Sequence, residues 1–519
     1  MPSPPPPQRP WQARPWKLAS LTAVSIWLVV CLHACPEFDL AGSLGIDGIR
    51  LDDESQLALA EQMGAAYMRV GFLWHQMQKG PQEPIDFDFM DKRVNTLVGR
   101  GSRHTFKVLG ILYGSAPWAA DCDRRYPLFP DCHDDPNYPP SEDHLDEYEH
   151  FVSETVRHFR DRVKEWEVWN EPNIGFRFWK PTIGGDPDAY GTVLKAAYRG
   201  IKGDPGDPAD GVCEECTVLF GGVFHSGAYT FFYETSGLGT PGGLRFIDLV
   251  HQHHPDIAGY FDAISLHPYM YACPAVFLSP FTAPEERTAM MGYDVRTKEY
   301  RPANYLDAIR DTRSLLAHIG APDKPIWITE SGWPTNYEWV GFFLPTGVSF
   351  LQQAQYLVRS FVLSLGEGVE KIIWWGFHDG PRWAMWQEES FGLIGDTSNP
   401  DYPDRPKPSY YAYRTLATQL SRTYRVQDVR EALSLAPDVE FGYRFTGERK
   451  QVTVLWRVSG NRSIDVPLGR PGSAVRGLSM LGEELPVRVT CSPSGCRAVG
   501  IEISPSPVYL VEVLDEKRG

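Results

Sequence analysis

Short apolar runs rich in Val, Ile, Phe and Trp alternate with amphipathic stretches from residue 41 to about residue 420. The pattern predicts a weak first strand near Leu44 and seven further strands at 66–72, 106–113, 164–170, 217–224, 262–269, 325–331 and 371–377. Helices are expected between them, for example at 54–63, 144–160, 304–319 and 350–366. Within 144–160, apolar side chains recur at i, i+3 and i+4 and so form one apolar face.

This alternation indicates a fold class. Strands that are regularly separated by helices imply parallel crossovers. Eight such units in about 380 residues predict a closed (β/α)8 TIM barrel, of class α/β. An open doubly wound sheet is the alternative, but no glycine-rich nucleotide fingerprint follows an early strand. The long connections 114–142, 225–241 and 270–303 all follow strands, so we expect them to gather at the C-terminal rim, where such barrels place their chemistry.

The pattern of apolar and polar residues changes after about residue 423. Five short alternating segments separated by turn residues lie at 451–458, 463–468, 486–490, 498–504 and 508–514. They predict a small antiparallel β-sandwich over 423–519, following a barrel over 36–422. The sandwich is interpreted either as a packing partner of the barrel or as a sugar-binding module.

The first 35 residues resemble a targeting segment. Residues 1–17 carry only basic charges, and an apolar run spans 18–32. A basic flank before a short apolar run is typical of a secretory signal. The run ends in Leu32-His33-Ala34-Cys35, which resembles a bacterial lipobox. We therefore expect an exported protein, extracellular or in the cell envelope, with a cleaved signal, a lipid anchor on Cys35, or an uncleaved anchor at 18–32.

Cysteine spacing agrees with export. Three close pairs are Cys122/Cys132, Cys213/Cys216 and Cys491/Cys496. Local loops closed by disulfides are typical of oxidising compartments. Cys213 and Cys216 could instead be half of a zinc site, but no second pair lies nearby at ligand spacing. We expect three disulfides, with Cys273 left free.

Composition excludes one class of partner and favours another. The 519 residues include 50 Lys and Arg against 66 Asp and Glu, a net charge of −16. Nucleic-acid binding needs a basic face, so no nucleic-acid partner is expected, and membrane contact is expected only through the leader. Aromatic residues make up 13% of the chain, and exposed rings of this kind stack on the apolar faces of sugars.

Two carboxylates stand at the tips of predicted strands. Trp169-Asn170-Glu171-Pro172 closes the fourth strand, and Trp327-Ile328-Thr329-Glu330 ends the seventh. An acidic residue in an otherwise apolar strand must be paired, protonated or functional, because burying an unpaired carboxylate is costly.

These motifs resemble those of the clan A retaining glycoside hydrolases over residues 44–420. The run from Trp169 to Lys202 is most similar to glycoside hydrolase family 39, although parts also resemble family 5. Where family 5 enzymes usually place a His after the third strand, this chain has Gly110–Trp118, which favours family 39. The resemblance implies that Glu171 is the general acid/base and Glu330 the nucleophile.

The resemblance also assigns substrate-binding residues. Arg69 in the second strand and Tyr269 after the sixth match positions that hydrogen-bond the nucleophile, and Asn170 matches the residue that holds the sugar 2-hydroxyl. His267 fits a sugar-binding or supporting role, and Trp375 resembles the platform that ends the eighth strand. Trp118 lies in a predicted rim loop and is expected to line a subsite.

The sequence therefore predicts a retaining β-glycosidase that hydrolyses O-glycosidic bonds of an extracellular or cell-envelope polysaccharide by double displacement. Charge repulsion across the expected gap of about 5–5.5 Å is expected to keep Glu171 protonated and Glu330 ionised. No cofactor is expected, and no metal, because His267 has no His-x-His partner. The alternatives are an exo-acting β-xylosidase or uronic-acid glycosidase of the same clan, a non-catalytic carbohydrate-binding barrel, and an envelope scaffold.

Overall fold

The structure is a computed structural model, which describes residues 39–514 except 101, 103, 122–134, 181, 183–184, 227–242, 271–281, 288–289, 336–346, 381–389, 400, 470–472 and 494. The predicted leader, the Cys122/Cys132 pair and Cys273 lie outside the described residues.

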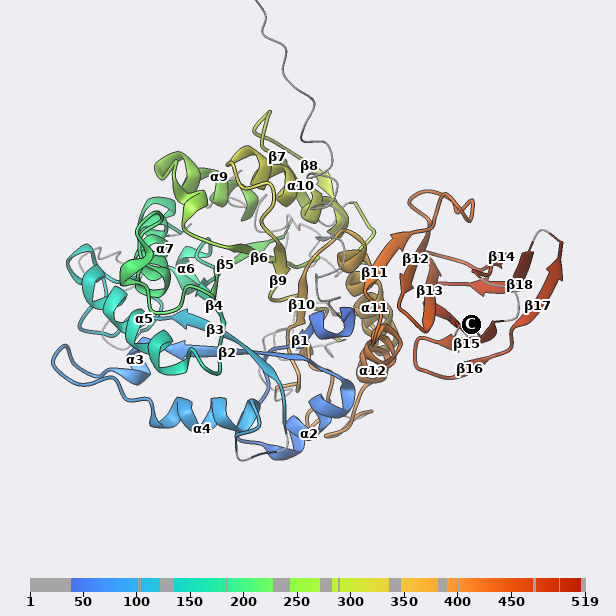
Figure 1. Cartoon of the computed structure of the whole chain (residues 1–519), viewed down its shortest axis with the longest axis horizontal. Coiled ribbons are helices and arrows are strands. Elements are labelled where there is room, and N and C mark those ends of the chain that lie inside the picture. The colour runs from blue at the N-terminus through green and yellow to red at the C-terminus, as the bar shows by residue number, and fades with distance from the viewer. Residues whose placement is uncertain are drawn as a thin grey trace, which may run out of the picture. The chain divides into compact units, whose positions relative to one another are not determined.

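Eight parallel strands close into a barrel in the order β1-β10-β9-β6-β5-β4-β3-β2 (Figure 1). They are β1 (Leu44–Ile46), β2 (Tyr67–Leu73), β3 (Lys107–Tyr113), β4 (Glu165–Asn170), β5 (Thr217–His225), β6 (Ala263–Pro268), β9 (Ile326–Ile328) and β10 (Lys371–Trp374). Each coincides with a strand expected from the sequence, so the predicted (β/α)8 fold is confirmed. The carboxyl ends of all eight strands consequently meet at one rim.

Helices form the outer ring of the barrel (Figure 1). They are α2 (Glu54–Met63), α4 (Asp88–Leu97), α5 (Leu145–Phe159), α7 (Pro187–Lys202), α9 (Gly243–His253), α10 (Tyr305–His318), α11 (Phe350–Gly366) and α12 (Pro408–Leu420). Their ends follow capping chemistry. For example, Asp53 accepts hydrogen bonds from the N–H groups of Ser55 and Gln56 at the start of α2, and Gly64 ends that helix at φ 86°.

The rim connections hold short elements of their own. They are α3 (Trp74–Met77), α6 (Gly175–Phe178) and the antiparallel hairpin of β7 (Met290–Asp294) and β8 (Glu299–Ala303). Single 3-10 turns occur at Leu40–Ser43, Glu142–His144, Pro208–Asp210 and Ile257–Gly259. The hairpin lies inside the 270–303 segment, for which the sequence predicted no strand.

The C-terminal strands form a six-stranded sheet, β11-β12-β13-β19-β15-β16, and a three-stranded sheet, β14-β18-β17. They are β11 (Arg425–Asp428), β12 (Glu440–Thr446), β13 (Lys450–Arg457), β14 (Arg462–Pro467), β15 (Ala474–Ser479), β16 (Glu484–Leu485), β17 (Arg488–Ser492), β18 (Gly495–Ile503) and β19 (Val508–Val513). An apolar cluster that includes Leu455, Val466, Ala498 and Leu510 draws on strands of both sheets. The predicted antiparallel sandwich is confirmed.

Buried polar contacts fasten the sandwich to the barrel. Trp456 Nε1 on β13 donates to Glu285 Oε1 at 2.7 Å, and Arg359 on α11 lies 3.4 Å from Glu285 Oε2. Arg359 Nε also donates to the carbonyl of Pro505 at 3.1 Å. Because Glu285 and Arg359 are nearly inaccessible to solvent, this junction is a continuation of the core, as expected for a packing partner.

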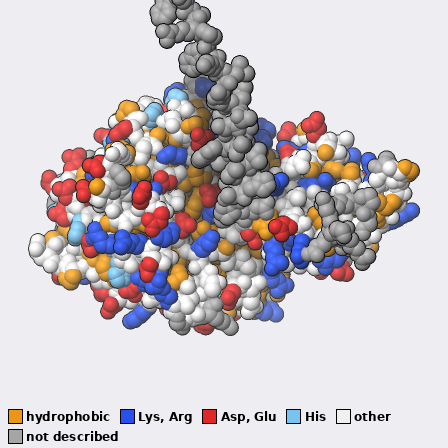
Figure 2. Space-filling model, viewed as in Figure 1, with side chains coloured by type: hydrophobic (Ala, Val, Ile, Leu, Met, Phe, Trp, Pro, Cys, Tyr) orange, Lys and Arg blue, Asp and Glu red, His pale blue; other side chains and the backbone are white. Residues whose placement is uncertain are grey.

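Two of the expected disulfides are present, Cys213–Cys216 and Cys491–Cys496. Within the described part of the chain, no helix is long and apolar enough to cross a membrane. On the face shown in Figure 2, acidic and basic side chains are interspersed over the described surface.

Candidate active site

The end of β4 holds Glu171 in an unusual backbone conformation. Trp169 and Glu171 have φ values of 73° and 44°, a region that residues other than Gly rarely adopt and that is commonly found at functional sites. The buried indole of Trp169 fixes the turn by donating to the carbonyl of Phe178 at 2.7 Å. The N–H of Glu171 donates to the carbonyl of Gly222 at 2.9 Å, which attaches this turn to β5.

Glu330 lies two residues beyond β9 and accepts two hydrogen bonds. Arg69 Nη1 donates to Oε1, and the hydroxyl of Tyr269 donates to Oε2 at 2.9 Å. Only 7% of Glu330 and 5% of Glu171 are exposed. Both carboxyl groups are therefore largely shielded from solvent, where electrostatic interactions are strong.

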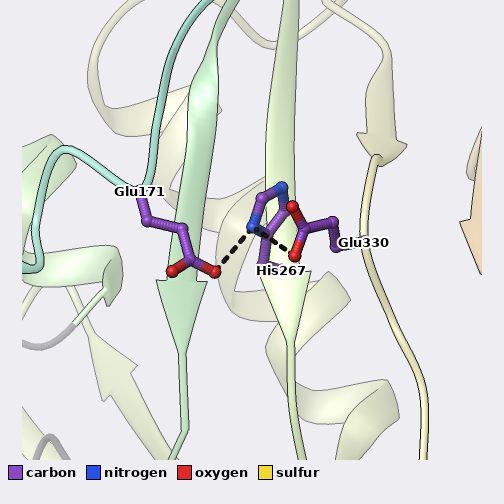
Figure 3. Close-up of side chains that lie close together, drawn as sticks. All are labelled: Glu171, His267 and Glu330. Carbon is purple, nitrogen blue, oxygen red and sulfur yellow. Dashed lines mark hydrogen bonds and ion pairs between the residues drawn. The ribbon is translucent and has the colours of Figure 1, made fainter. Parts of the chain in front are cut away.

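The side chain of His267 lies between the two carboxyl groups (Figure 3). Its Nδ1 is 2.9 Å from Glu171 Oε1 and 3.6 Å from Glu330 Oε2. The facing polar atoms of the three side chains all lie within 4.8 Å of one another. Glu171 and Glu330, 159 positions apart in the sequence, thus come close together, with one carboxylate oxygen of each within 4.8 Å of the other.

Gly222 makes room for this histidine. A Cβ atom built on Gly222, which is paired with Asn170 across β4 and β5, would lie 2.0 Å from Nε2 of His267. A side chain at this position would displace the ring from between the carboxyl groups.

Arg69 on β2 connects the ends of β1, β4 and β9. Besides Glu330, its guanidinium donates to Asp47 Oδ2 at 2.8 Å, Glu167 Oε2 at 2.7 Å and Asn170 Oδ1 at 2.8 Å. Asp47 and Glu167 were not singled out in the sequence. Glu167 carried the same signal as Glu330, a carboxylate within an apolar strand, whereas Asp47 follows a strand that the pattern indicates only weakly.

The nearby carboxylates of Asp47 and Glu167 change the charge that is expected for Glu330. Burial raises the pKa of Glu330 to about 7, with Asp47 and Glu167 adding to the rise and Arg69 and Tyr269 opposing it. Burial likewise raises the pKa of Asp47. From the sequence we expected an ionised Glu330, because Glu171 repels a second charge and Arg69 and Tyr269 favour the charged form of Glu330. The two further carboxylates that share the guanidinium of Arg69, those of Asp47 and Glu167, were not counted.

Asn170, Trp375 and Trp118 differ in how closely they approach this centre. Asn170 accepts from Arg69 through Oδ1, which leaves its NH2 as the donor end. Trp375 is half-buried just beyond β10, and its backbone N–H donates to the carbonyl of Ser331 at 2.9 Å. Trp118 packs edge-on against Trp74 and His144, so its described contacts are with the rim and not with the carboxyl pair.

Glu171, His267 and Glu330 are the group of described side chains that is spaced closely enough to share a metal ion. The chemistry around them favours hydrogen bonding. Both oxygens of Glu330 already accept from Arg69 and Tyr269, and the adjacent guanidinium charge opposes a cation.

Neither models of known protein families nor curated protein sequences match this sequence. Solved structures do match. A family 39 glycoside hydrolase from Bacteroides cellulosilyticus WH2 is similar with a TM-score of 0.62 and 20% identity, over 92% of this chain and 82% of that one. A GH30 endoxylanase from Clostridium papyrosolvens C71 has a TM-score of 0.55 and 11% identity, over 92% and 97%. SrfJ from Salmonella typhimurium has a TM-score of 0.54 and 13% identity, over 93% and 92%.

At these identities the comparisons establish the shared fold. They confirm at the level of structure the likeness to clan A glycoside hydrolases, including family 39, that the motifs indicated.

Proposed function

We propose that this protein is a retaining β-glycosidase that hydrolyses O-glycosidic bonds of an extracellular or cell-envelope polysaccharide. The observation that carries the proposal is the separation of the carboxyl groups of Glu171 and Glu330, whose facing oxygens lie within 4.8 Å. Retaining enzymes hold their carboxyl groups about 5–5.5 Å apart, whereas inverting enzymes leave about 6.5–9.5 Å for a water molecule. The gap favours direct attack by one carboxylate.

In the first step, Glu330 attacks the anomeric carbon while Glu171 protonates the departing glycosidic oxygen. The carbon–oxygen bond to the leaving group breaks, and an ester bond to Glu330 forms. The donor end of Asn170 is placed to hold the sugar 2-hydroxyl, a contact that strengthens in the transition state. Arg69 and Tyr269 stabilise the ionised form of Glu330 and so define its attacking state.

In the second step, the ester on Glu330 is neutral, so the charge that disfavoured ionisation of Glu171 is gone. Glu171 then takes a proton from water, and the oxygen of that water attacks the anomeric carbon and releases Glu330. The sugar leaves with its original anomeric configuration.

We also propose how the chain is divided into segments and where the protein is located. We assign residues 1–35 to an export leader, with anchoring through Cys35 or residues 18–32, residues 36–422 to the barrel and residues 423–519 to the sandwich. The Cys213–Cys216 and Cys491–Cys496 disulfides support an oxidising compartment.

Azide rescue tests the proposed roles. Glu330→Gly should abolish turnover of an aryl β-glycoside, and added azide should restore it with an α-glycosyl azide as product. Glu171→Ala should retain turnover of activated aryl glycosides, and azide should give the β product. Glu142→Ala, at an exposed rim residue, serves as the control. Wild-type rates on a glycan in both active-site variants would refute the proposal. A glycan hydrolysis screen with wild-type protein identifies the sugar.

A further inference from the structure

A chain of buried hydrogen bonds runs from Arg69 to Glu171. Arg69 Nε donates to Glu167 Oε2 at 2.7 Å, and the hydroxyl of Thr329 donates to Glu167 Oε1 at 2.7 Å. Thr329 Oγ1 lies 2.9 Å from His267 Nε2, and His267 Nδ1 lies 2.9 Å from Glu171 Oε1. Glu167, Thr329 and His267 are all 0% exposed, so water does not compete for these bonds.

The positions of the protons follow from the chemistry of the groups. Glu167, paired with Arg69, is a carboxylate and only accepts. Two oxygens 2.7 Å apart need a proton between them, so the single hydroxyl proton of Thr329 points to Glu167. The oxygen of Thr329 must then accept from His267, which places a proton on Nε2.

His267 is neutral, because burial lowers its pKa well below 6.5 and the charge of Arg69 lowers it further. A neutral imidazole with its proton on Nε2 has a lone pair on Nδ1. The contact of 2.9 Å between Nδ1 and Glu171 Oε1 therefore needs a proton from Glu171.

We infer that Glu167 and Thr329 are positioning residues that fix the tautomer of His267 and thereby hold the acid proton on Glu171. This inference rests on the proposed function, because it explains which of two facing carboxyl groups is the acid. Nδ1 presents its lone pair closer to Glu171, at 2.9 Å, than to Glu330, at 3.6 Å. The substrate's glycosidic oxygen competes with Nδ1 for the proton, and the second step returns a proton to Glu171.

The tautomer can be read without any substrate. In protein labelled with 15N-histidine, the ring signals of His267 are assigned by difference from His267→Asn. We expect Nε2 to carry the proton and Nδ1 to have the resonance of an unprotonated nitrogen. A proton on Nδ1 in the wild-type protein would overturn the inference. This readout is independent of activity, so it stands or fails separately from azide rescue.

Thr329→Val removes the hydroxyl at nearly constant volume and leaves Nε2–H without its acceptor. We expect the proton of His267 to move to Nδ1, where it stabilises ionised Glu171. The rate on a glycoside with a poor leaving group should fall at least tenfold, while the glycosylation rate on an activated aryl glycoside should change less than threefold. Thr329→Ser should restore the wild-type tautomer and rates. An unchanged tautomer in Thr329→Val, or equal losses on both substrates, would contradict the inference.

Discussion

Nη1 of Arg69 donates to Oε1 of Glu330, so the carboxylate proposed as nucleophile is tied to β2 at its reacting end. The same guanidinium reaches β4 through Asn170 and Glu167. One side chain thus sets the relative positions of the strand ends that carry the two carboxyl groups proposed as catalytic. Such a junction needs the planar guanidinium of arginine with its several N–H donors. The single ammonium group of lysine cannot replace it.

Arg69→Lys should lower kcat/KM by about 100-fold, the scale on which loss of one preorganised electrostatic contact acts. A lysine keeps the charge but cannot contact Glu330, Glu167 and Asn170 at once. Steady-state kinetics measure the loss. Arg100→Lys, in the exposed ion pair with Asp161, is the matched control, and a change below threefold in Arg69→Lys would contradict the proposed role.

The pH profile should show that Glu330 must be ionised. Since burial raises its pKa to about 7, kcat/KM of the free enzyme should fall as the pH drops through about 7. Asp47→Asn removes a negative charge that contributes to this rise, so the acid limb should move to lower pH. Profiles of the wild type and Asp47→Asn measure the shift, and a limb displaced to higher pH would show that the account of these charges is wrong.

Acid should also destabilise the fold through His225 at the end of β5. Neither ring nitrogen of this buried side chain has a partner among the described residues, and burial lowers its pKa from 6.5 to about 4. The unfolded chain binds one more proton between these values, so stability is lost as the pH falls below 6.5, by about 3 kcal/mol in full.

Urea unfolding at pH 7 and pH 5 tests this prediction. The free energy of unfolding lost between the two pH values should be about 2 kcal/mol smaller in His225→Leu than in the wild type. His150→Leu, at an exposed position, controls for the removal of a histidine. Equal acid losses in His225→Leu and the wild type would refute the role of His225.

The junction between sandwich and barrel should contribute to stability. Trp456→Phe retains the aromatic packing but removes the Nε1–H that donates to buried Glu285. We expect the free energy of unfolding to fall by about 1–3 kcal/mol, the cost of leaving a buried acceptor without that donor. Denaturant unfolding measures the change, with Val489→Ala on exposed β17 as control. Wild-type stability in Trp456→Phe would argue against a structural role for this contact.

Local patterns predicted most of the fold. The barrel strands are rich in apolar and β-branched residues. Because helices separate them regularly, the sequence predicted that the sheet closes into a barrel. The β7–β8 hairpin was missed because β8, Glu299–Ala303, is short and contains a proline and two charged residues, which strands usually avoid. In the sandwich, the five predicted segments did not include β11, β12, β15 or β16. Of these, β16 is only two residues long and exposed, which is too short for any pattern.

The sequence predicted those site residues that stand out individually in their local sequence. Glu171 and Glu330 stand out because a carboxylate at the end of an apolar strand is costly to bury unless it is paired, protonated or functional. Thr329 gave no signal, because a β-branched hydroxyl residue is ordinary in a strand. Its partner Glu167 is 162 positions away, and such a contact is visible only once β4 and β9 are placed in the barrel.

The central claim is that Glu330 forms the covalent intermediate, and trapping that intermediate tests it most directly. A 2-deoxy-2-fluoro β-glycoside of the sugar identified by the screen, with an activated leaving group, should inactivate the enzyme. Peptide mass spectrometry should then locate the sugar on Glu330. A label on another residue, or multiple turnovers of the glycan with inverted anomeric configuration, would contradict the account.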